Sequence, residues 1–415
     1  MIPPKIIIHT QLCLVLLLLW GNLDAQRMSA RDFFIAGTAK YRCNACRPAI
    51  EDFTKALLLE PEYANAFLGR GLSHLCLKQY EEAVQDIKRA QILNDKEPLF
   101  VHGMGRVMQE RGDLKGALIE FTKATELDRH CWQAWYSKGE VLVSMNQNLA
   151  AEIDLNEALS QNPNCGVCWL EKGKGMLNDD KFEDAIKFFT KALDKISNYA
   201  EIWFLRGKSY VGLNRYSESI QDFTRAIEIE PENSNYRVQR AKSQYFSGQV
   251  VNAMDDLNQS IRLDRKNGEA WLYKGKVTKA IGYPEKAISF YSHSIRVNPK
   301  MYQAYVERGE TYLALLKPEK GLPDLNEAIN LNPTDMPLRI RTGNILYGTR
   351  DFTAALAEFK YVLKKYPENM EALLGEGMSL MQLNRKPEAC QSLKKAASLG
   401  NERAAGEVKS NCSGF

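Results

Sequence analysis

The feature that most constrains this chain is a period of 34 residues in its small side chains. With residue 30 as the first position, position 8 of each period is glycine in ten cases and alanine in one. Position 20 is alanine in nine cases, with Ser219 and Gly321 as the exceptions. No insertion or deletion changes this phase between residues 30 and 403, so we expect eleven tandem copies of one structural unit. The residues at position 8 are Gly37, Gly71, Gly105, Gly139, Gly173, Gly207, Ala241, Gly275, Gly309, Gly343 and Gly377.

Each unit is expected to be a hairpin of two α-helices. Small residues at positions 8 and 20 let the two helices cross closely, because a protein interior has no spare volume for larger side chains. Positions 4, 24 and 28 are bulky and are expected to fill the hairpin. The tryptophans at position 4 are Trp135, Trp169, Trp203 and Trp271. Proline, which cannot continue a helix, ends the second helix at position 32 in Pro61, Pro163, Pro231, Pro299, Pro333 and Pro367.

This pattern resembles the tetratricopeptide repeat, whose Trp–Leu–Gly–Tyr–Ala–Phe–Ala–Pro positions match those described above. The resemblance covers about nine-tenths of the chain. It implies an all-α fold, a right-handed α-solenoid whose concave groove is lined by the first helix of each hairpin and binds peptides or extended protein segments. The expected repeats span residues 30–63, 64–97, 98–131, 132–165, 166–199, 200–233, 234–267, 268–301, 302–335, 336–369 and 370–403.

Charges also follow the repeat. Position 7 is basic and position 23 is acidic in five repeats, which predicts ion pairs between the helices of one hairpin or of neighbouring hairpins. The five pairs are Arg70/Asp86, Lys138/Asp154, Arg206/Asp222, Arg240/Asp256 and Arg308/Asp324. In two further repeats a phenylalanine stands opposite the basic residue, in Lys172/Phe188 and Lys274/Phe290.

Residues 1–25 are expected to be a secretory signal peptide. Lys5 provides a positive start, residues 12–20 form a continuous apolar run, and cleavage is expected near Ala25. The alternative is an uncleaved anchor, but the apolar segment is shorter than the roughly 20 residues of a spanning helix. The mature chain is therefore expected to be exported without a membrane span. We favour a bacterial periplasm or cell surface, with a eukaryotic secretory lumen or the extracellular space as the alternative.

Residues 401–415 are expected to form a capping helix and a tail, because Asn401 is a good N-cap residue after Gly400. Cys390 lies ten residues before Gly400 and Cys412 lies twelve after it. An antiparallel turn at Gly400 would place these two cysteines side by side. In an exported chain we expect them to form a disulfide that holds the cap in place.

Two Cys-x-x-Cys pairs are present, Cys43/Cys46 and Cys165/Cys168. A zinc site needs four converging ligands, and two pairs so far apart in a solenoid cannot provide them, so no metal is expected. Redox exchange of the thioredoxin type belongs to a different fold. Disulfides within each pair are favoured, with buried or unpaired thiols as the alternative. Cys76 and Cys131 have no evident partner in the sequence.

The sequence contains no motif for catalysis. It has no phosphate-binding glycine loop, no His-Glu-x-x-His and no Gly-x-Ser-x-Gly. The repeats leave no room for a catalytic domain, and the net charge of +4 is too small a basic excess to indicate nucleic-acid binding. We therefore expect no enzyme activity, no cofactor and no nucleic-acid partner.

Four lysines share position 9, which faces the groove in the family that the sequence resembles. These residues, named here the lysine ladder, are Lys174, Lys208, Lys242 and Lys276. Nearby groove positions carry Phe204, Tyr245, Phe246 and Tyr273. Basic groups beside aromatic rings suit an acidic extended peptide or an anionic glycan. The alternative is a solvated polar face that repeat duplication has made regular.

These observations predict an exported scaffold or adaptor that binds proteins or peptide segments, including acidic ones, in its groove. The alternative function is a binder of an anionic glycan or of another envelope component through the lysine ladder. Both functions rely on shape and charge complementarity, without chemistry on the ligand.

Overall fold

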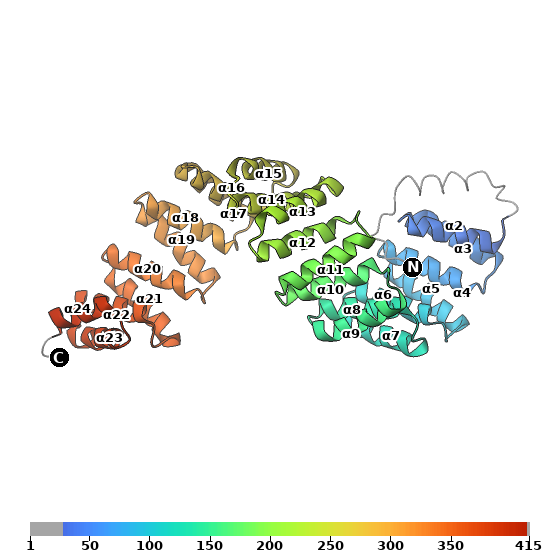
Figure 1. The fold of residues 1–415 in the computed structure, drawn as a ribbon, viewed down its shortest axis with the longest axis horizontal. Coiled ribbons are helices and arrows are strands. Elements are labelled where there is room, and N and C mark those ends of the chain that lie inside the picture. Colours follow the sequence, from blue (N-terminus) through green and yellow to red (C-terminus); the bar gives the residue numbers. More distant parts are fainter. Residues whose placement is uncertain (1–27, 413–415) are drawn as a thin grey trace. The chain divides into compact units, whose positions relative to one another are not determined.

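The computed structural model describes residues 28–412, and the expected signal peptide at residues 1–25 lies outside them. The described residues form helices and turns with no strand, and none of their helices is long and apolar enough to cross a membrane. The chain divides after Pro231 into two compact units, each of which is described by itself (Figure 1). The helices of the first unit are α2 (Ala30–Arg42), α3 (Cys46–Leu59), α4 (Ala64–Cys76), α5 (Tyr80–Leu93), α6 (Pro98–Glu110), α7 (Leu114–Leu127), α8 (Trp132–Ser144), α9 (Asn148–Gln161), α10 (Gly166–Asn178), α11 (Phe182–Lys195), α12 (Ala200–Gly212) and α13 (Tyr216–Ile229). The helices of the second unit are α14 (Ser234–Phe246), α15 (Val250–Leu263), α16 (Gly268–Ala280), α17 (Pro284–Val297), α18 (Tyr302–Ala314), α19 (Pro318–Leu331), α20 (Met336–Gly348), α21 (Phe352–Lys365), α22 (Met370–Gln382), α23 (Lys386–Ser398) and α24 (Glu402–Asn411).

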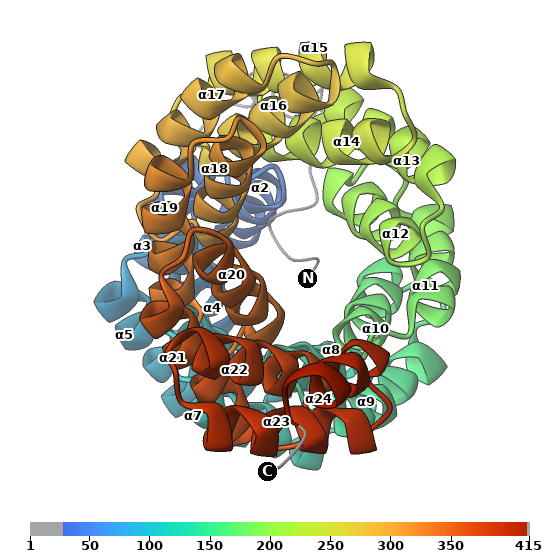
Figure 2. The same ribbon diagram turned by 90° about the vertical axis from the view of Figure 1, so that its left-hand side faces the viewer.

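In both units consecutive helices pack in pairs joined by short turns, as is typical of a tetratricopeptide solenoid. The second helix of each pair contacts its own first helix and, within a unit, the first helix of the next pair. First helices also contact one another, as α6 contacts α8 and α8 contacts α10. Figure 2 shows α10 and α12 on the inner side of the first unit, with α11 and α13 outside them. The first helices of a unit therefore share one inner face.

Each helix pair turns through a residue with positive φ at position 15 of the repeat. Glycine, asparagine or aspartate, which tolerate this left-handed conformation, fills the position in most turns. Lys78 (φ 59°), Leu316 (φ 58°) and Arg350 (φ 66°) are the exceptions among the described turns. Side-chain caps then start several helices; the carboxylate of Asp113, for example, accepts a hydrogen bond of 2.9 Å from the N–H of Gly116.

The core of each hairpin is the large side chain at position 24, which lies against the small residue at position 8. Phe121 is fully buried, and a Cβ atom added at Gly105 would lie 2.5 Å from its ring. The backbone at position 20 is close as well, since the carbonyl oxygen of Ala83 would lie 3.2 Å from a Cβ atom on Gly71. The expectation that positions 8 and 20 meet is confirmed at such sites, but the ring at position 24 fills most of the space.

The tryptophans at position 4 pack against the hairpin cores, as expected, but they cover the edge of each core and do not fill its centre. All four are only partly buried. The indole N–H of Trp135 donates a 2.9 Å hydrogen bond to the carbonyl of Arg129, six residues earlier, and Trp203 and Trp271 repeat the contact. Because an indole combines an apolar body with one N–H donor, it can cover the flank of a hairpin and still satisfy a loop carbonyl.

The predicted ion pairs at positions 7 and 23 are confirmed in all five repeats, and each joins the two helices of one hairpin. Three of the arginines also reach the preceding hairpin; Arg206, for example, donates to Asp222 at 2.8 Å and to the hydroxyl of Thr190 at 3.0 Å. Where phenylalanine replaces the acid, the lysine lies over the ring instead. The Nζ of Lys172 is 4.6 Å from the ring centroid of Phe188.

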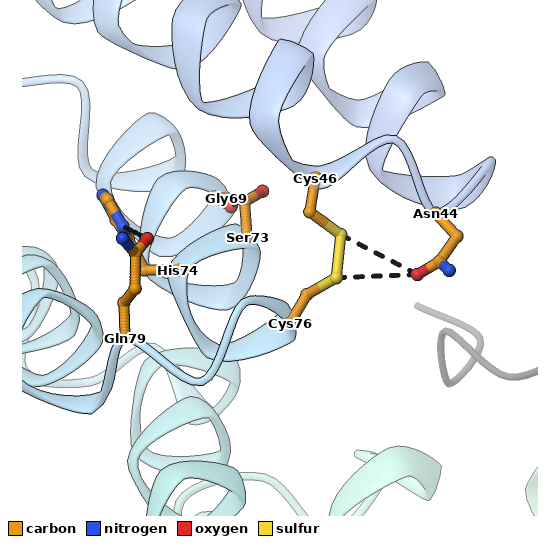
Figure 3. Close-up of a disulfide and its surroundings, with 7 residues drawn as sticks. All are labelled: Asn44, Cys46, Gly69, Ser73, His74, Cys76 and Gln79. Atoms are coloured by element: carbon orange, nitrogen blue, oxygen red, sulfur yellow. Dashed lines mark hydrogen bonds between the residues drawn. A yellow bond between two sulfur atoms is a disulfide. The ribbon is translucent and has the colours of Figure 1, made fainter.

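The N-terminal disulfide differs from the expected Cys43–Cys46 pair. Cys46, the first residue of α3, is joined to Cys76, the last residue of α4, with 6.4 Å between their Cα atoms (Figure 3). The Oδ1 atom of Asn44 lies 3.5 Å from the sulfur of Cys76. The physical reason is the stacking of hairpins, which places the start of a second helix against the end of the next first helix.

Two other disulfides join cysteine pairs that the sequence analysis expected to be bonded. Cys165 and Cys168 are joined at the start of α10, with 5.3 Å between their Cα atoms. Cys390 on α23 is joined to Cys412, which follows α24, with 5.6 Å between their Cα atoms. Among the described cysteines, Cys131 is a buried free thiol. The last disulfide holds α24 against the final hairpin.

Candidate ligand-binding surface

The inner face of the first unit carries two members of the lysine ladder. The Nζ of Lys174 forms ion pairs with Glu171 at 2.9 Å and Glu201 at 3.0 Å. Lys208 is exposed, and its Nζ lies 5.9 Å from the ring centroid of Phe204. Among the described residues, no carboxylate forms an ion pair with Lys208. Lys174 is therefore neutralised within the protein, whereas Lys208 is exposed beside an aromatic ring.

The inner face of the second unit holds the other two lysines of the ladder. Lys242 pairs with Glu269 at 2.9 Å, and Lys276 pairs with Glu307 at 3.2 Å. Both ammonium groups also lie over the ring of Tyr273, at 5.2 Å and 5.3 Å from its centroid. Two lysines thus enclose a single buried tyrosine, and each has its own carboxylate.

The aromatic groove residues of this unit lie together. Tyr245 meets Tyr273 edge-on at 6.4 Å between ring centroids, and it also contacts Phe246, which is half exposed. Glu307 accepts a second lysine, Lys279, at 2.6 Å. Burial raises the pKa of Glu307, but the hydrogen bonds and charges of Lys279 and Lys276 outweigh burial, and the net shift is downward.

The carboxylate partners of the ladder were missed by the sequence reasoning. Glu201 and Glu269 occupy position 2 of the following repeat, and Glu171 and Glu307 occupy position 6. The ion pair between Glu171 and Lys174 could have been predicted, because residues three apart on one helix are neighbours. The other three contacts connect successive hairpins. The inner faces therefore carry both signs of charge instead of a row of free cations.

Glu171 is the most perturbed titratable group of the inner face. It is fully buried, and this burial raises its pKa to about 7 despite the opposing charge of Lys174; the charges of Glu140 and Glu201 act in the same direction as burial. Burial also lowers the pKa of Lys174, but Glu171 and Glu201 outweigh it and the net shift is upward. Two carboxylates thus share one ammonium group between α10 and α12.

A second polar cluster lies between α6 and α8 on the same face. The guanidinium of Arg106 and the amide of Gln109 both donate to Glu140, at 2.8 Å and 2.9 Å. The hydroxyl of Tyr136 donates to the other oxygen of Glu140 at 3.3 Å. The first helices of repeats three to six thus carry partly exposed polar side chains, namely Arg106, Gln109, Glu140, Lys174 and Glu201.

His102 and Ser137 form the one arrangement on this face that resembles a catalytic pair. The Nε2 atom of His102 lies 2.9 Å from the Ser137 hydroxyl. However, Ser137 is buried, and burial lowers the pKa of His102 to about 3, which makes it a poor general base at neutral pH. The imidazole also contacts the Phe121 ring at 5.3 Å between centroids. These features assign the pair to packing between α6 and α8. Among the described residues, no cluster of histidine, cysteine and acidic side chains could hold a metal ion.

Comparison with known proteins identifies the repeats. Three family models, each described as a tetratricopeptide repeat, match residues 36–98 and 340–405, residues 200–233, and residues 133–165. No curated protein matches the chain. Among solved structures, MamA is 20% identical over 39% of this chain and 94% of its own, with a TM-score of 0.35. YrrB, described as a TPR protein with an unusual peptide-binding site, is 23% identical over 44% of this chain and 95% of its own, with a TM-score of 0.36. A tetratricopeptide repeat protein from Parabacteroides merdae is 16% identical over 59% of this chain and 96% of its own, with a TM-score of 0.48. The family-model matches, together with the residue pattern and the paired helices, support a tetratricopeptide repeat protein.

Proposed function

We propose that the protein is an exported scaffold that binds extended protein segments along the inner faces of its helical units. The proposal rests on the partly exposed charged, amide and aromatic side chains that recur on successive first helices within each unit. An extended segment presents a backbone hydrogen-bond donor and acceptor at every residue. Polar side chains on successive helices can form hydrogen bonds with these groups while the ligand stays extended. Recognition then depends on complementarity alone, which agrees with the family's usual role as an interaction scaffold.

The charges of the inner faces favour a ligand segment of mixed character. Lys174, Lys242 and Lys276 already have carboxylate partners, so a uniformly acidic ligand would have to displace them. We assign Lys208 as the member of the ladder that contacts the ligand. Together with Phe204 it would accommodate an acidic ligand residue next to an apolar one. The anionic-glycan alternative requires all four lysines, and these ion pairs make it the less favoured function.

Export is proposed from the cysteines together with the expected signal peptide. Disulfides persist in oxidising compartments and are rare in the cytosol. In this chain Cys46–Cys76 and Cys390–Cys412 connect separate helices near the two ends of the array. We place the mature protein in a bacterial periplasm or on the cell surface, with the eukaryotic secretory pathway as the alternative.

The test is affinity capture from the native compartment with the mature chain, followed by mass spectrometry of bound proteins. The Lys208→Glu variant should lose the captured partner or bind it at least about tenfold more weakly, as expected when a central interface contact is reversed in charge. Lys187→Glu is the matched control, because it makes the same charge change on α11, where the side chain is 71% exposed. Equal capture by both variants would contradict the proposal, and binding of a purified anionic glycan without any protein partner would favour the alternative.

A further inference from the structure

Exposed apolar side chains gather along one edge of the second unit. Three successive hairpins, α14–α15, α16–α17 and α18–α19, turn at this edge, which we name the turn edge. Its exposed apolar residues are Phe246, Val251, Ile281, Tyr283 and Leu316. Because they occupy positions 13 to 18 of consecutive repeats, the hairpin register places them on the same edge. Single exposed apolar residues are ordinary, whereas a group on neighbouring turns marks an interaction surface.

Leu316 makes the strongest case for a use of this edge. Its side chain is 88% exposed, and its φ of 58° lies in the left-handed region. The equivalent residue is Gly282 in the preceding turn and Gly248 in the turn before that. A leucine here is unfavourable for the backbone and for solvation alike. Such a combination persists where the side chain contributes something beyond the fold of its own hairpin.

The charges beside these apolar residues have both signs. Glu285 and Glu319 are the second residues of α17 and α19, Lys286 and Lys320 follow them directly, and Lys317 follows Leu316; all five are exposed. No ion pair within the described residues involves any of them. An apolar centre with unpaired charges of both signs at its rim is the composition of a protein–protein interface. An anionic lipid surface would repel the two glutamates, so a membrane fits this edge less well.

We propose that the turn edge binds the turn edge of a second copy of this chain, to form a two-fold symmetric dimer. A two-fold interface brings one surface against itself, so the surface must complement itself in charge. Glutamates and lysines that alternate at the rim meet this requirement, since each carboxylate of one copy can face an ammonium group of the other. The apolar residues, with Leu316 at the centre, are then removed from water.

The first test measures the oligomeric state of the mature full chain by sedimentation equilibrium, with Leu316→Asn as the variant. Asparagine suits the left-handed turn and fills this position in other repeats, such as Asn214, so the variant should melt at the same temperature or higher. The dimer dissociation constant should nevertheless rise by about tenfold or more. The matched control is Leu149→Asn on α9 of the first unit, where the leucine is 78% exposed and the change should leave association unaltered.

A second test reverses the rim charges. The double variants Glu285→Lys with Glu319→Lys, and Lys286→Glu with Lys320→Glu, should each associate more weakly than the natural chain, because like charges then face each other. Mixed together, the two variants should form a heterodimer. Monomeric behaviour of the natural chain at every concentration would overturn the proposal. Unchanged association of the charge variants, or binding of the edge to lipid vesicles or another protein without self-association, would overturn it equally.

Discussion

The glycine at position 8 offers a direct test of how the hairpins pack. In Gly105→Ala the new methyl group would lie 2.5 Å and 2.7 Å from two carbons of the Phe121 ring, whereas an ordinary carbon–carbon contact is about 3.5–4.0 Å. The ring is fully buried and cannot turn outward. Overpacking of this kind costs about 1–3 kcal/mol, and alanine recovers about 0.5–1 kcal/mol because it is a better helix former than glycine. We therefore expect a net loss of up to about 2.5 kcal/mol.

The seventh repeat supplies the rescue for this experiment. It has Ala241 at position 8 and Leu257 at position 24, and both are fully buried. Gly105→Ala combined with Phe121→Leu reproduces that natural pair, so its stability loss should be smaller than the sum of the two single changes. Gly406→Ala on α24 is the control, since an added Cβ atom there meets no atom within 4 Å and should stabilise the helix.

The assay must report on one hairpin, because repeat arrays seldom unfold in a single two-state step. Hydrogen exchange of the α6 and α7 amides measures the local opening free energy in the hairpin concerned. Faster exchange in Gly105→Ala and partial recovery in the double variant are the expected results. Additive losses in the double variant, or a stabilised Gly105→Ala, would refute the account of position 8.

Three further predictions concern single groups. Burial raises the pKa of Glu171 from its ordinary 4.5 to about 7, so its favourable contribution is complete below pH 4.5 and is lost as the pH rises through about 7. The melting temperature of Glu171→Gln should fall less between pH 5 and pH 8 than that of the natural chain, and parallel pH profiles would contradict this. Ala134→Cys should form a disulfide with Cys131, because these positions correspond to Cys168 and Cys165 one repeat later; thiol titration would detect the lost thiol, and a persistent free thiol would argue against the correspondence. Replacement of both Cys390 and Cys412 by serine should lower the stability of the C-terminal cap by about 3 kcal/mol, the value for a closed loop of this length, and the loss should appear as faster hydrogen exchange in α24 but not in α20.

Contacts within a hairpin could be predicted from the sequence because the repeat phase fixes them. Positions 7 and 23 recur with opposite charge, and the Arg70–Asp86 pair follows directly from their spacing. The small residue at position 8 likewise predicted that the two helices of a hairpin cross closely. The role of Trp135 was less accessible, because bulk alone does not distinguish a core side chain from one that covers a flank and donates to a loop carbonyl.

Contacts between hairpins were harder to predict, because they depend on how one repeat is rotated against the next. The Cys46–Cys76 disulfide joins position 17 of one repeat to position 13 of the following repeat. The same positions meet elsewhere, since a Cβ atom on Gly212 would lie 2.6 Å from the Phe182 ring. The spacing of cysteines in the sequence gave no measure of that rotation.

The helix on which each ladder lysine lies could be predicted from the sequence, but the acidic partners of these lysines in the following repeats could not. The lysine ladder does lie on the first helices, but Glu201 and Glu269 of following repeats neutralise Lys174 and Lys242. The lysines recur at one position of the repeat and are easy to recognise in the sequence. Their carboxylate partners occupy other positions of the following repeat, so the contacts become evident only in the structure. This difference moves the expected ligand from an acidic segment to one of mixed character.

Site-specific photo-crosslinking tests the central claim most directly. A photo-reactive residue at position 208, on the inner face of α12, is compared with one at position 187, on the outer surface of α11, in the mature chain within its native compartment. We predict that position 208 captures one recurring protein segment and that position 187 does not. Capture of the same segment from position 187, or from neither position while the protein still binds its partner, would contradict a ligand surface on the first helices.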